Sequence, residues 1–149
     1  MAFSQKIKDL IATAWGDNCP CLIGTVGPEG PNISPKGSVI VYDDNHLAYW
    51  ERSKKKALEN LQHDKRVVVL YSNMKAQRDG VLPSGVLRFY GSAELHESGP
   101  IRDAIFAKLA KREHHHHAAA HARPSCRAGR SRDASSAPWE PAAGWQSPN

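Results

Sequence analysis

Residues 49–56 read Tyr49-Trp50-Glu51-Arg52-Ser53-Lys54-Lys55-Lys56, and no other stretch of the chain is as informative. The stretch joins the apolar end of an expected strand to a serine that can cap a helix and to basic residues in the helix's first turn. At a helix start, backbone N–H groups are unpaired and the helix dipole favours an anion. Arginine adds a planar fork and lysine a point charge, so the stretch predicts a site for a phosphate-sized anion.

A run of three lysines is more often a solvated helix face, and that interpretation stays open. The position of the run favours the anion site, because it lies at a strand-to-helix junction directly after an aromatic pair. A phosphate monoester fits such a corner, since several charge-assisted donors converge on it.

Working outward from this stretch, the hydrophobic pattern predicts strands and helices in close succession. We expect strands at 21–26, 32–36, 38–42, 46–50, 66–71 and 86–95, helices at 4–15, 53–62 and 98–112, and a polar, mobile loop at 73–84. Pro35 indicates a sheet edge or a bulge, and the Val-rich strand at 66–71 is typical of one buried on both faces. This order predicts a mainly β (α+β) fold, a small antiparallel barrel with two or three helices.

Composition places the chain among ordinary globular domains. Its 149 residues are 40% hydrophobic and 23% charged, with a net charge of +5 that is not gathered into a basic arm. No apolar run approaches the roughly 20 residues that span a bilayer, and the N-terminus does not resemble a secretory signal. Three cysteines (Cys19, Cys21 and Cys126) are too few for a disulfide scaffold. We therefore expect a cytoplasmic protein.

The composition changes sharply near Arg112. Residues 113–149 contain no Val, Ile, Leu, Phe, Met, Tyr or Lys and are rich in Ala, Arg, Pro, Ser and His. Such a segment buries too little apolar surface to offset its chain entropy. We interpret 1–112 as the folded domain and 113–149 as a disordered or frame-shifted tail, and a relative that carries the same tail in frame would contradict the second idea.

In the order of its motifs, the chain resembles the pyridoxamine 5′-phosphate oxidase-related FMN-binding split barrels. The resemblance covers roughly residues 4–112, and each of its pieces is weak alone. It rests on Gly24-Thr25, Gly30-Pro31-Asn32-Ile33-Ser34-Pro35-Lys36-Gly37-Ser38, Tyr49-Trp50-Glu51-Arg52-Ser53, Asn60-Leu61, Asp64-Lys65-Arg66-Val67, Leu87-Arg88-Phe89-Tyr90-Gly91 and Glu94-Leu95-His96.

The resemblance implies a six-stranded antiparallel split barrel that forms a homodimer, with FMN in clefts between the protomers. It also implies roles for particular residues of this chain. The flavin ring and ribityl chain would lie along Lys36, Gly37, Ser38 and Val39. Trp50 and Glu51 would close the site, and the phosphate would be held by Arg52, Ser53, Lys54 and Lys56.

Two departures from the family pattern limit what is carried over. Relatives usually continue into another apolar strand after the last helix, and residues 113–149 offer no convincing one. A C-terminal Trp and Arg segment, which the authentic pyridoxamine phosphate oxidases use, has no sound match here. Vitamin B6 oxidation is therefore not favoured.

We hypothesise an FMN-dependent oxidoreductase that acts on a small molecule, with no side chain identifiable as an acid or base. The alternative is a non-catalytic protein that binds FMN, F420 or haem. The basic corner would serve F420 as well as FMN, because both carry a phosphate and a tricyclic ring. A nucleic-acid-binding barrel is disfavoured, since the positive charge gathers at one corner without repeated aromatics along a groove.

The remaining features have plainer interpretations. The histidines at 114–117 and 121 lie in the tail without the ligand pattern of a metal site, so we expect no metal. Cys19-Pro20-Cys21 is not the redox motif with two intervening residues, and structural thiols are the simpler interpretation. Trp15, Tyr49 and Tyr90 are interpreted as core or interface residues. Walker, dinucleotide-binding and nucleophile-elbow motifs are all missing.

Overall fold

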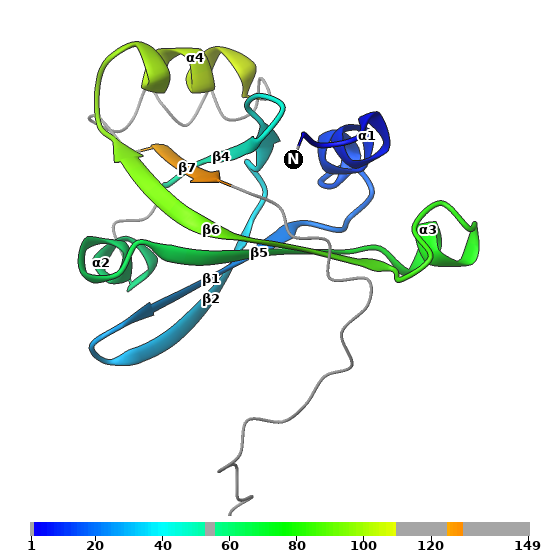
Figure 1. Ribbon diagram of the computed structural model, residues 1–149, viewed down its shortest axis with the longest axis horizontal. Coiled ribbons are helices and arrows are strands. Elements are labelled where there is room, and N and C mark those ends of the chain that lie inside the picture. Colours follow the sequence, from blue (N-terminus) through cyan, green and yellow to red (C-terminus); the bar gives the residue numbers. More distant parts are fainter. Residues whose placement is uncertain (1, 53–55, 110–124, 130–149) are drawn as a thin grey trace, which may run out of the picture.

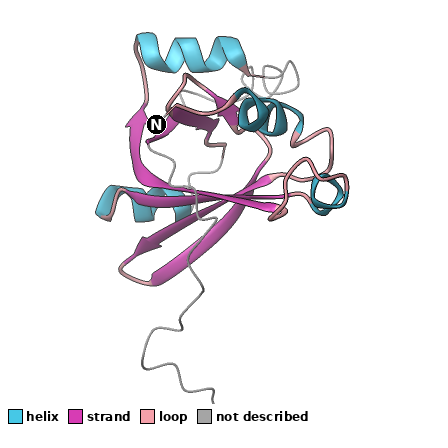
Figure 2. Cartoon of the chain, turned by 45° about the vertical axis from the view of Figure 1, so that its right-hand side comes forward, coloured by secondary structure: helices cyan, strands magenta, loops and turns pink. Residues whose placement is uncertain are grey.

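A computed structural model of the chain describes residues 2–52, 56–109 and 125–129 (Figure 1). The elements follow in the order α1 (Gln5–Thr13), β1 (Cys21–Gly27), β2 (Gly30–Lys36), β3 (Ile40–Val41), β4 (His46–Trp50), α2 (Lys56–His63), β5 (Arg66–Ser72), α3 (Met74–Arg78), β6 (Val86–His96), α4 (Pro100–Lys108) and β7 (Ser125–Gly129). The seven strands form one sheet in the order β2-β1-β5-β6-β7-β4-β3, and every adjacent pair is antiparallel. The predicted α+β class with an antiparallel sheet is confirmed (Figure 2).

Local sequence signals account for the first half of the sheet. Ser4 caps α1 by accepting a hydrogen bond from the backbone N–H of Ile7. The β1–β2 hairpin closes where Gly27 pairs with Gly30, and β2 is an end strand, as Pro35 predicted. Gly30 has φ of +108°, which glycine adopts without strain.

The prediction that residues 113–149 supply no strand is wrong for one short segment. Strand β7 lies between β4 and β6 and pairs with both, Ser125 facing Trp50 on one side and His96 on the other. A strand ladder uses backbone N–H and C=O groups, so it forms without Val, Ile or Leu side chains where two strands present open edges. The sheet therefore has seven strands where six were expected. The rest of the predicted tail lies outside the described residues.

The predicted mobile loop at 73–84 contains a short helix, α3. The Asn73 side chain accepts a hydrogen bond from the backbone N–H of Ala76 at 2.9 Å and donates one to the Tyr71 hydroxyl at 2.9 Å. Ala76 and Leu82 are buried. The glycine and proline residues of the segment favoured a loop in the sequence pattern. The segment nevertheless contains a one-turn helix, whose start is fixed by the Asn73 cap.

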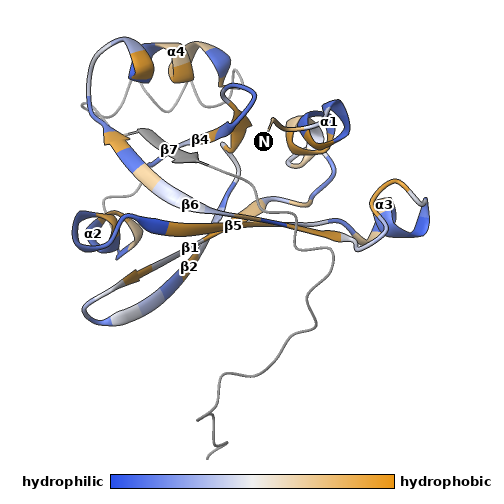
Figure 3. Ribbon diagram, in the orientation of Figure 1, coloured by the Kyte–Doolittle hydropathy of each residue, from blue (hydrophilic) through white to orange (hydrophobic). Residues whose placement is uncertain are grey.

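The helices and the sheet enclose a core on one face of the sheet. Ile11 and Leu10 of α1 pack with Ile23 of β1, Val69 of β5 and Phe89 of β6. The predicted inward residues Leu58 and Leu61 of α2 are buried as well, and the Nδ2 group of Asn60 donates to Thr25 on the same face of β1. Figure 3 shows hydrophobic stretches along β1 and β5, which are both interior strands of the sheet.

The opposite face of β2, β1, β5 and β6 also carries many apolar side chains, and we call it the outer face. The strand registers place there, together with the polar residues Arg66, Ser72, Arg88 and Ser92, a set of apolar side chains none of which belongs to the core cluster: Leu22, Val26, Pro31, Ile33, Pro35, Val68, Leu70, Val86 and Tyr90. Strand β5 was expected to be buried on both faces, but its pattern alternates and Val68 and Leu70 are only partly covered. Ile33 is 71% exposed.

An interlocked set of polar contacts fixes the connection between β2 and β3 against the end of β4. The Lys36 ammonium donates to both Glu51 oxygens, at 2.8 and 2.7 Å, and the two side chains are only 10% and 1% exposed. The Ser38 hydroxyl accepts from the Trp50 backbone N–H at 3.0 Å and donates to the Trp50 carbonyl at 3.1 Å. We call these contacts the Lys36–Trp50 clamp. It turns the chain at Ser38, which leaves β3 shorter than the predicted strand.

The clamp predicts strong coupling between Lys36 and Glu51. Removing one charge strands the other in a buried place, so Glu51→Gln and Lys36→Met should each lower the free energy of unfolding by about 3–5 kcal/mol. The double variant should lose clearly less than the sum of the two, as measured by urea unfolding followed by circular dichroism.

The matched control is the exposed pair of Lys75 and Asp79 on α3. Lys75→Met and Asp79→Asn should change the unfolding free energy by less than about 1 kcal/mol each. Additive losses at Lys36 and Glu51 would contradict a buried, coupled pair.

Candidate functional site

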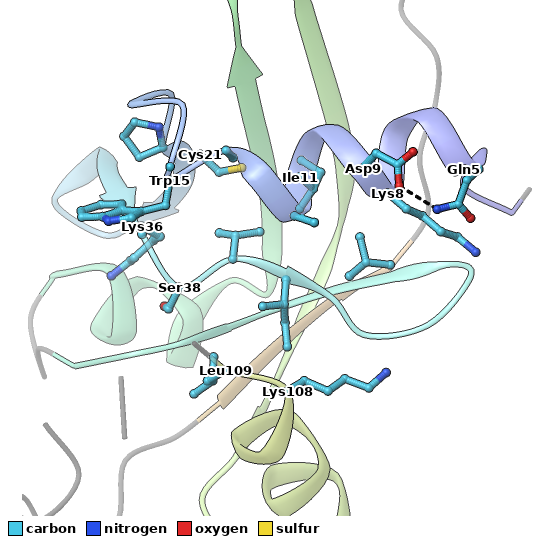
Figure 4. A pocket seen from close by; sticks show the side chains of 18 residues that line it. Gln5, Lys8, Asp9, Ile11, Trp15, Cys21, Lys36, Ser38, Lys108 and Leu109 are labelled. Atoms are coloured by element: carbon cyan, nitrogen blue, oxygen red, sulfur yellow. Dashed lines mark hydrogen bonds between the residues drawn. The ribbon is translucent and has the colours of Figure 1, made fainter. Parts of the chain in front are cut away.

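A cavity of about 650 Å³ lies between α1, the β2–β3 connection and the end of α4. Its volume is in the range of small-molecule sites. The lining residues are Gln5, Lys8, Asp9, Ile11, Ala12, Ala14, Trp15, Gly16, Pro20, Cys21, Lys36, Gly37, Ser38, Val39, Ile40, Val41, Lys108 and Leu109. Figure 4 shows Trp15 and Lys36 near one end of the cavity and Lys8, Asp9 and Gln5 along α1 toward the other.

Four of the predicted site residues lie together on one wall of this cavity. Lys36, Gly37, Ser38 and Val39 follow one another along the β2–β3 connection. Ser38 is buried and its hydroxyl is engaged by Trp50, so this wall has a fixed backbone course. The lysine ammonium is neutralised by Glu51, so Lys36 does not present an uncompensated charge to the cavity.

Trp50 and Glu51, predicted to close the site, are buried and do not line the cavity. The Trp50 ring packs against Phe106 of α4, with ring centroids 5.5 Å apart, and the Arg102 guanidinium lies 5.1 Å from the Trp50 ring. Both residues contact the wall on the side away from the cavity, Glu51 through its ion pair with Lys36 and Trp50 through its hydrogen bonds with Ser38.

The predicted phosphate corner is only partly within the described residues. Arg52 is exposed, and Lys56 at the start of α2 forms a surface ion pair with Glu29 in the β1–β2 turn. The hydrogen bond from Lys56 lowers the pKa of the Glu29 carboxyl below its ordinary value. Neither basic residue lines the cavity. Ser53 and Lys54 lie outside the described residues.

The sequence interpretation missed the contribution of α1 to this site. Trp15 was assigned to the core or an interface, but it lines the cavity and is 49% exposed. Its ring lies directly on Gly37, where an added Cβ would come within 2.3 Å of the Trp15 Cζ3 atom. In the sequence, only the glycine at position 37, between Lys36 and Ser38, could have indicated this contact, because Trp15 lies 22 positions earlier.

Cys21 lines the cavity from the start of β1 and is buried. Burial raises the pKa of its thiol from 9.0 to about 12. This pKa lies above the value in the unfolded chain. The free energy of unfolding is therefore not reduced by this thiol below pH 9, and it falls as the pH rises from 9 toward 12. The site therefore contains a neutral thiol at physiological pH, in line with the structural role predicted for it.

We expect Cys21 to react with iodoacetamide at least about 100-fold more slowly than the partly exposed Cys19 at pH 8, because the thiolate is the nucleophile. Mass spectrometry of the labelled peptides measures both rates. In guanidinium the two rates should become similar, and equal labelling of the folded protein would contradict the burial of Cys21.

The described residues contain neither a metal-binding cluster nor a membrane-spanning helix. No cluster of three or more His, Cys, Asp or Glu within residues 2–52, 56–109 and 125–129 could hold a metal ion. The histidines at 114–117 and 121 lie outside those ranges. Among the helices that the structure describes, none is long and apolar enough to cross a membrane.

Solved structures share the fold at low sequence identity. HupZ from Group A Streptococcus has a TM-score of 0.63 at 22% identity, covering 87% of this chain and 90% of its own. A candidate pyridoxamine 5′-phosphate oxidase from Lactobacillus delbrueckii has a TM-score of 0.61 at 23% identity, covering 87% and 91%. An FMN-binding protein from Syntrophomonas wolfei has a TM-score of 0.53 at 12% identity, covering 90% and 87%. No match was found among curated proteins.

A family model described as pyridoxamine 5′-phosphate oxidase matches residues 4–133. The match starts at the cap of α1 and continues past the composition change to include β7. It covers well over half of the 149 residues, and the resemblance found in the motifs is thereby confirmed. The chain belongs to the pyridoxamine 5′-phosphate oxidase family.

Proposed function

We propose that this protein binds FMN and acts as a flavin-dependent oxidoreductase on a small molecule, working as a homodimer. The observation that carries the proposal is the cavity wall formed by Lys36–Val39, the segment that the family resemblance assigns to the cofactor. Family membership supports the same assignment, and a protein of similar fold is described as FMN-binding. A bound flavin would supply hydride transfer, while the chain supplies binding, orientation and electrostatics.

In this proposal the clamp orients the ring-binding wall and the basic corner holds the phosphate. Because Lys36 and Ser38 are tied to Glu51 and Trp50, the wall keeps its shape whether or not a ligand is present. Arg52 and Lys56 would contact the phosphate. Lys56 would then exchange its surface contact with Glu29 for the phosphate, an exchange that loses little because exposed ion pairs are weak.

The purified protein should retain about one FMN per chain after desalting, seen in its absorbance spectrum. Arg52→Ala combined with Lys56→Ala should weaken FMN binding at least about tenfold, because charge-assisted hydrogen bonds to the phosphate are lost. Riboflavin, which has no phosphate, should bind both proteins alike. Lys75→Ala on α3 is the matched control, since Lys75 also forms an exposed ion pair, with Asp79.

A colourless protein that does not retain FMN would contradict the proposal. A yellow protein that transfers no electrons from reduced nicotinamides to an acceptor would support the alternative of non-catalytic flavin binding. Retention of F420 in place of FMN would keep the phosphate-binding role of Arg52 and Lys56 and would change the cofactor from FMN to F420. None of the described cavity residues is a histidine, so they offer haem no imidazole ligand.

The outer face supports the homodimer. It holds aliphatic side chains from three adjacent strands, including Val26 and Ile33 among the exposed large hydrophobic residues. A contiguous apolar sheet face of this kind is costly in water and typical of an interface. A second copy of the chain is the occupant that the family resemblance implies, and two identical apolar faces are chemically complementary.

Ile33→Asp should convert the dimer into a monomer, because it would bury two carboxylates at an isologous interface. Analytical ultracentrifugation gives the mass, and circular dichroism checks the fold. Val81→Asp is the control, since Val81 is an exposed valine on the β5–β6 connection and is not among the outer-face residues. A monomeric wild-type protein, or an Ile33→Asp variant that remains dimeric, would refute this assembly.

A further inference from the structure

One end of the cavity carries a basic group from α4. Lys108 lines the cavity, is exposed, and in Figure 4 extends toward the end away from Trp15 and Lys36. Among the described residues its ammonium has two neutral partners. It donates to the Tyr42 backbone carbonyl and lies 5.2 Å from the centroid of the Tyr42 ring. A carbonyl and a ring hold the ammonium in place without neutralising its charge.

The other lysines of the lining are each paired with a carboxylate. Lys8 lies 2.6 Å from Asp44, and Lys36 binds both oxygens of Glu51. Each of these pairs is neutral as a whole. Lys108 is therefore the lysine of the lining that no carboxylate within the described residues neutralises by direct contact.

The acidic side chains in this part of the molecule have other partners. Asp9 belongs to the lining, but its carboxylate accepts a hydrogen bond from the Gln5 amide at 2.7 Å on the exposed side of α1 (Figure 4). Asp43 lies 2.6 Å from the Nδ1 atom of His46 and does not line the cavity. A carboxylate or phosphate that enters the cavity can therefore contact Lys108 without displacing an acidic side chain.

The surface next to Lys108 is mainly aliphatic. Ile11 and Ala14 line the cavity from α1, and Val39, Ile40 and Leu109 line it from the other elements. A ligand that matches both features has an apolar body and a negative charge at one end. Burial of the apolar body is favourable, and the charged end gains a charge-assisted hydrogen bond.

We propose that Lys108 is a specificity-determining residue, which binds an anionic group, a carboxylate or a phosphate, of a ligand whose apolar part occupies the cavity. The inference rests on the proposed function for its biological use, and it narrows the substrate of the oxidoreductase to a small apolar molecule with an anionic group. The same chemistry has a second source, because FMN itself carries a phosphate.

The test compares 2-naphthoate with 2-naphthamide, which share one apolar ring system and differ in charge. Equilibrium dialysis against the full-length protein freed of FMN should show naphthoate binding at least about fivefold more tightly, because the amide lacks the charge-assisted hydrogen bond. Lys108→Met should abolish this preference by weakening the binding of naphthoate alone. Lys108→Arg, which keeps the charge, should retain most of it.

Lys75→Met on α3 is the matched control. Lys75 is also an exposed lysine, it pairs with Asp79, and it does not line the cavity. This variant should leave the preference for naphthoate unchanged. Added sodium chloride should reduce the preference of the wild-type protein, because the charge of an exposed lysine is screened by salt.

The binding of FMN distinguishes the two sources of the anion. If Lys108→Met weakens FMN binding at least about fivefold and leaves riboflavin binding unchanged, the flavin phosphate occupies this end of the cavity. If FMN binding is unchanged and naphthoate binds the FMN-loaded protein with the same dependence on Lys108, the anionic group belongs to the substrate. Either outcome supports the proposal.

Equal binding of naphthoate and amide, no binding of either, or a Lys108→Met variant that keeps the preference would overturn the proposal. Naphthoate that FMN displaces, while FMN binding does not depend on Lys108, would overturn it as well. Failure of the proposed function has a different signature, namely a Lys108-dependent preference for naphthoate in a protein that retains no FMN. Thermal unfolding shows whether each variant is folded, and Lys108→Gln replaces Lys108→Met if the latter is not.

Discussion

The buried ion pair of Lys36 and Glu51 is the interaction on which the rest of the site depends. Two charges removed from water lose several kcal/mol of hydration each, and only close geometry restores it. The bidentate contact at 2.7 and 2.8 Å provides that geometry, and the Ser38 hydroxyl completes it by bonding both backbone groups of Trp50. A hydrophobic pair would tolerate sliding between β2 and β4. The ion pair does not tolerate such sliding, because any displacement would leave an unpaired charge in the interior. The β2–β3 connection is therefore held in one conformation.

The sheet divides the molecule into two environments with different consequences. On its inner face, α1 and α2 bury Ile11, Leu61 and their neighbours, which stabilises the domain by itself. On the outer face, aliphatic side chains from β1, β2 and β5 remain outside the core cluster. Strand β7 links these parts to the clamp, since it supplies the only described pairing between β6 and the β3–β4 hairpin. A segment without Val, Ile or Leu thus supplies the strand that joins β6 to the β3–β4 hairpin.

What the sequence could predict was local. The apolar face of α1, the turn between Gly27 and Gly30, the edge position of Pro35 and the inward leucines of α2 follow from spacing within a few residues. Apart from the short helix α3, the missed features join distant positions. β7 forms because it pairs with the open edges of two other strands. Lys36 pairs with Glu51, 15 positions later in the sequence, and Trp15 contacts Gly37, 22 positions later. No periodicity records such pairs. The resemblance placed Lys36–Val39 at the ligand, and the cavity lies there, but only the structure brings α1 to the opposite wall.

The opposite wall owes its position to contacts at both ends of α1. Before the helix, the Phe3 backbone N–H donates to the Asp44 carbonyl, and one turn later Lys8 binds the Asp44 side chain. After the helix, Trp15 rests on Gly37, and Cys21 opens β1 only a few residues further on. Helix α1 is therefore fastened to the β3–β4 turn at one end and to the clamped connection at the other. Closing the gap between α1 and the β2–β3 connection would break the contacts of Phe3 and Lys8 with Asp44 and would move Trp15 off the Gly37 backbone. These contacts within the chain favour the open cavity, which reduces the ordering that a ligand would have to offset.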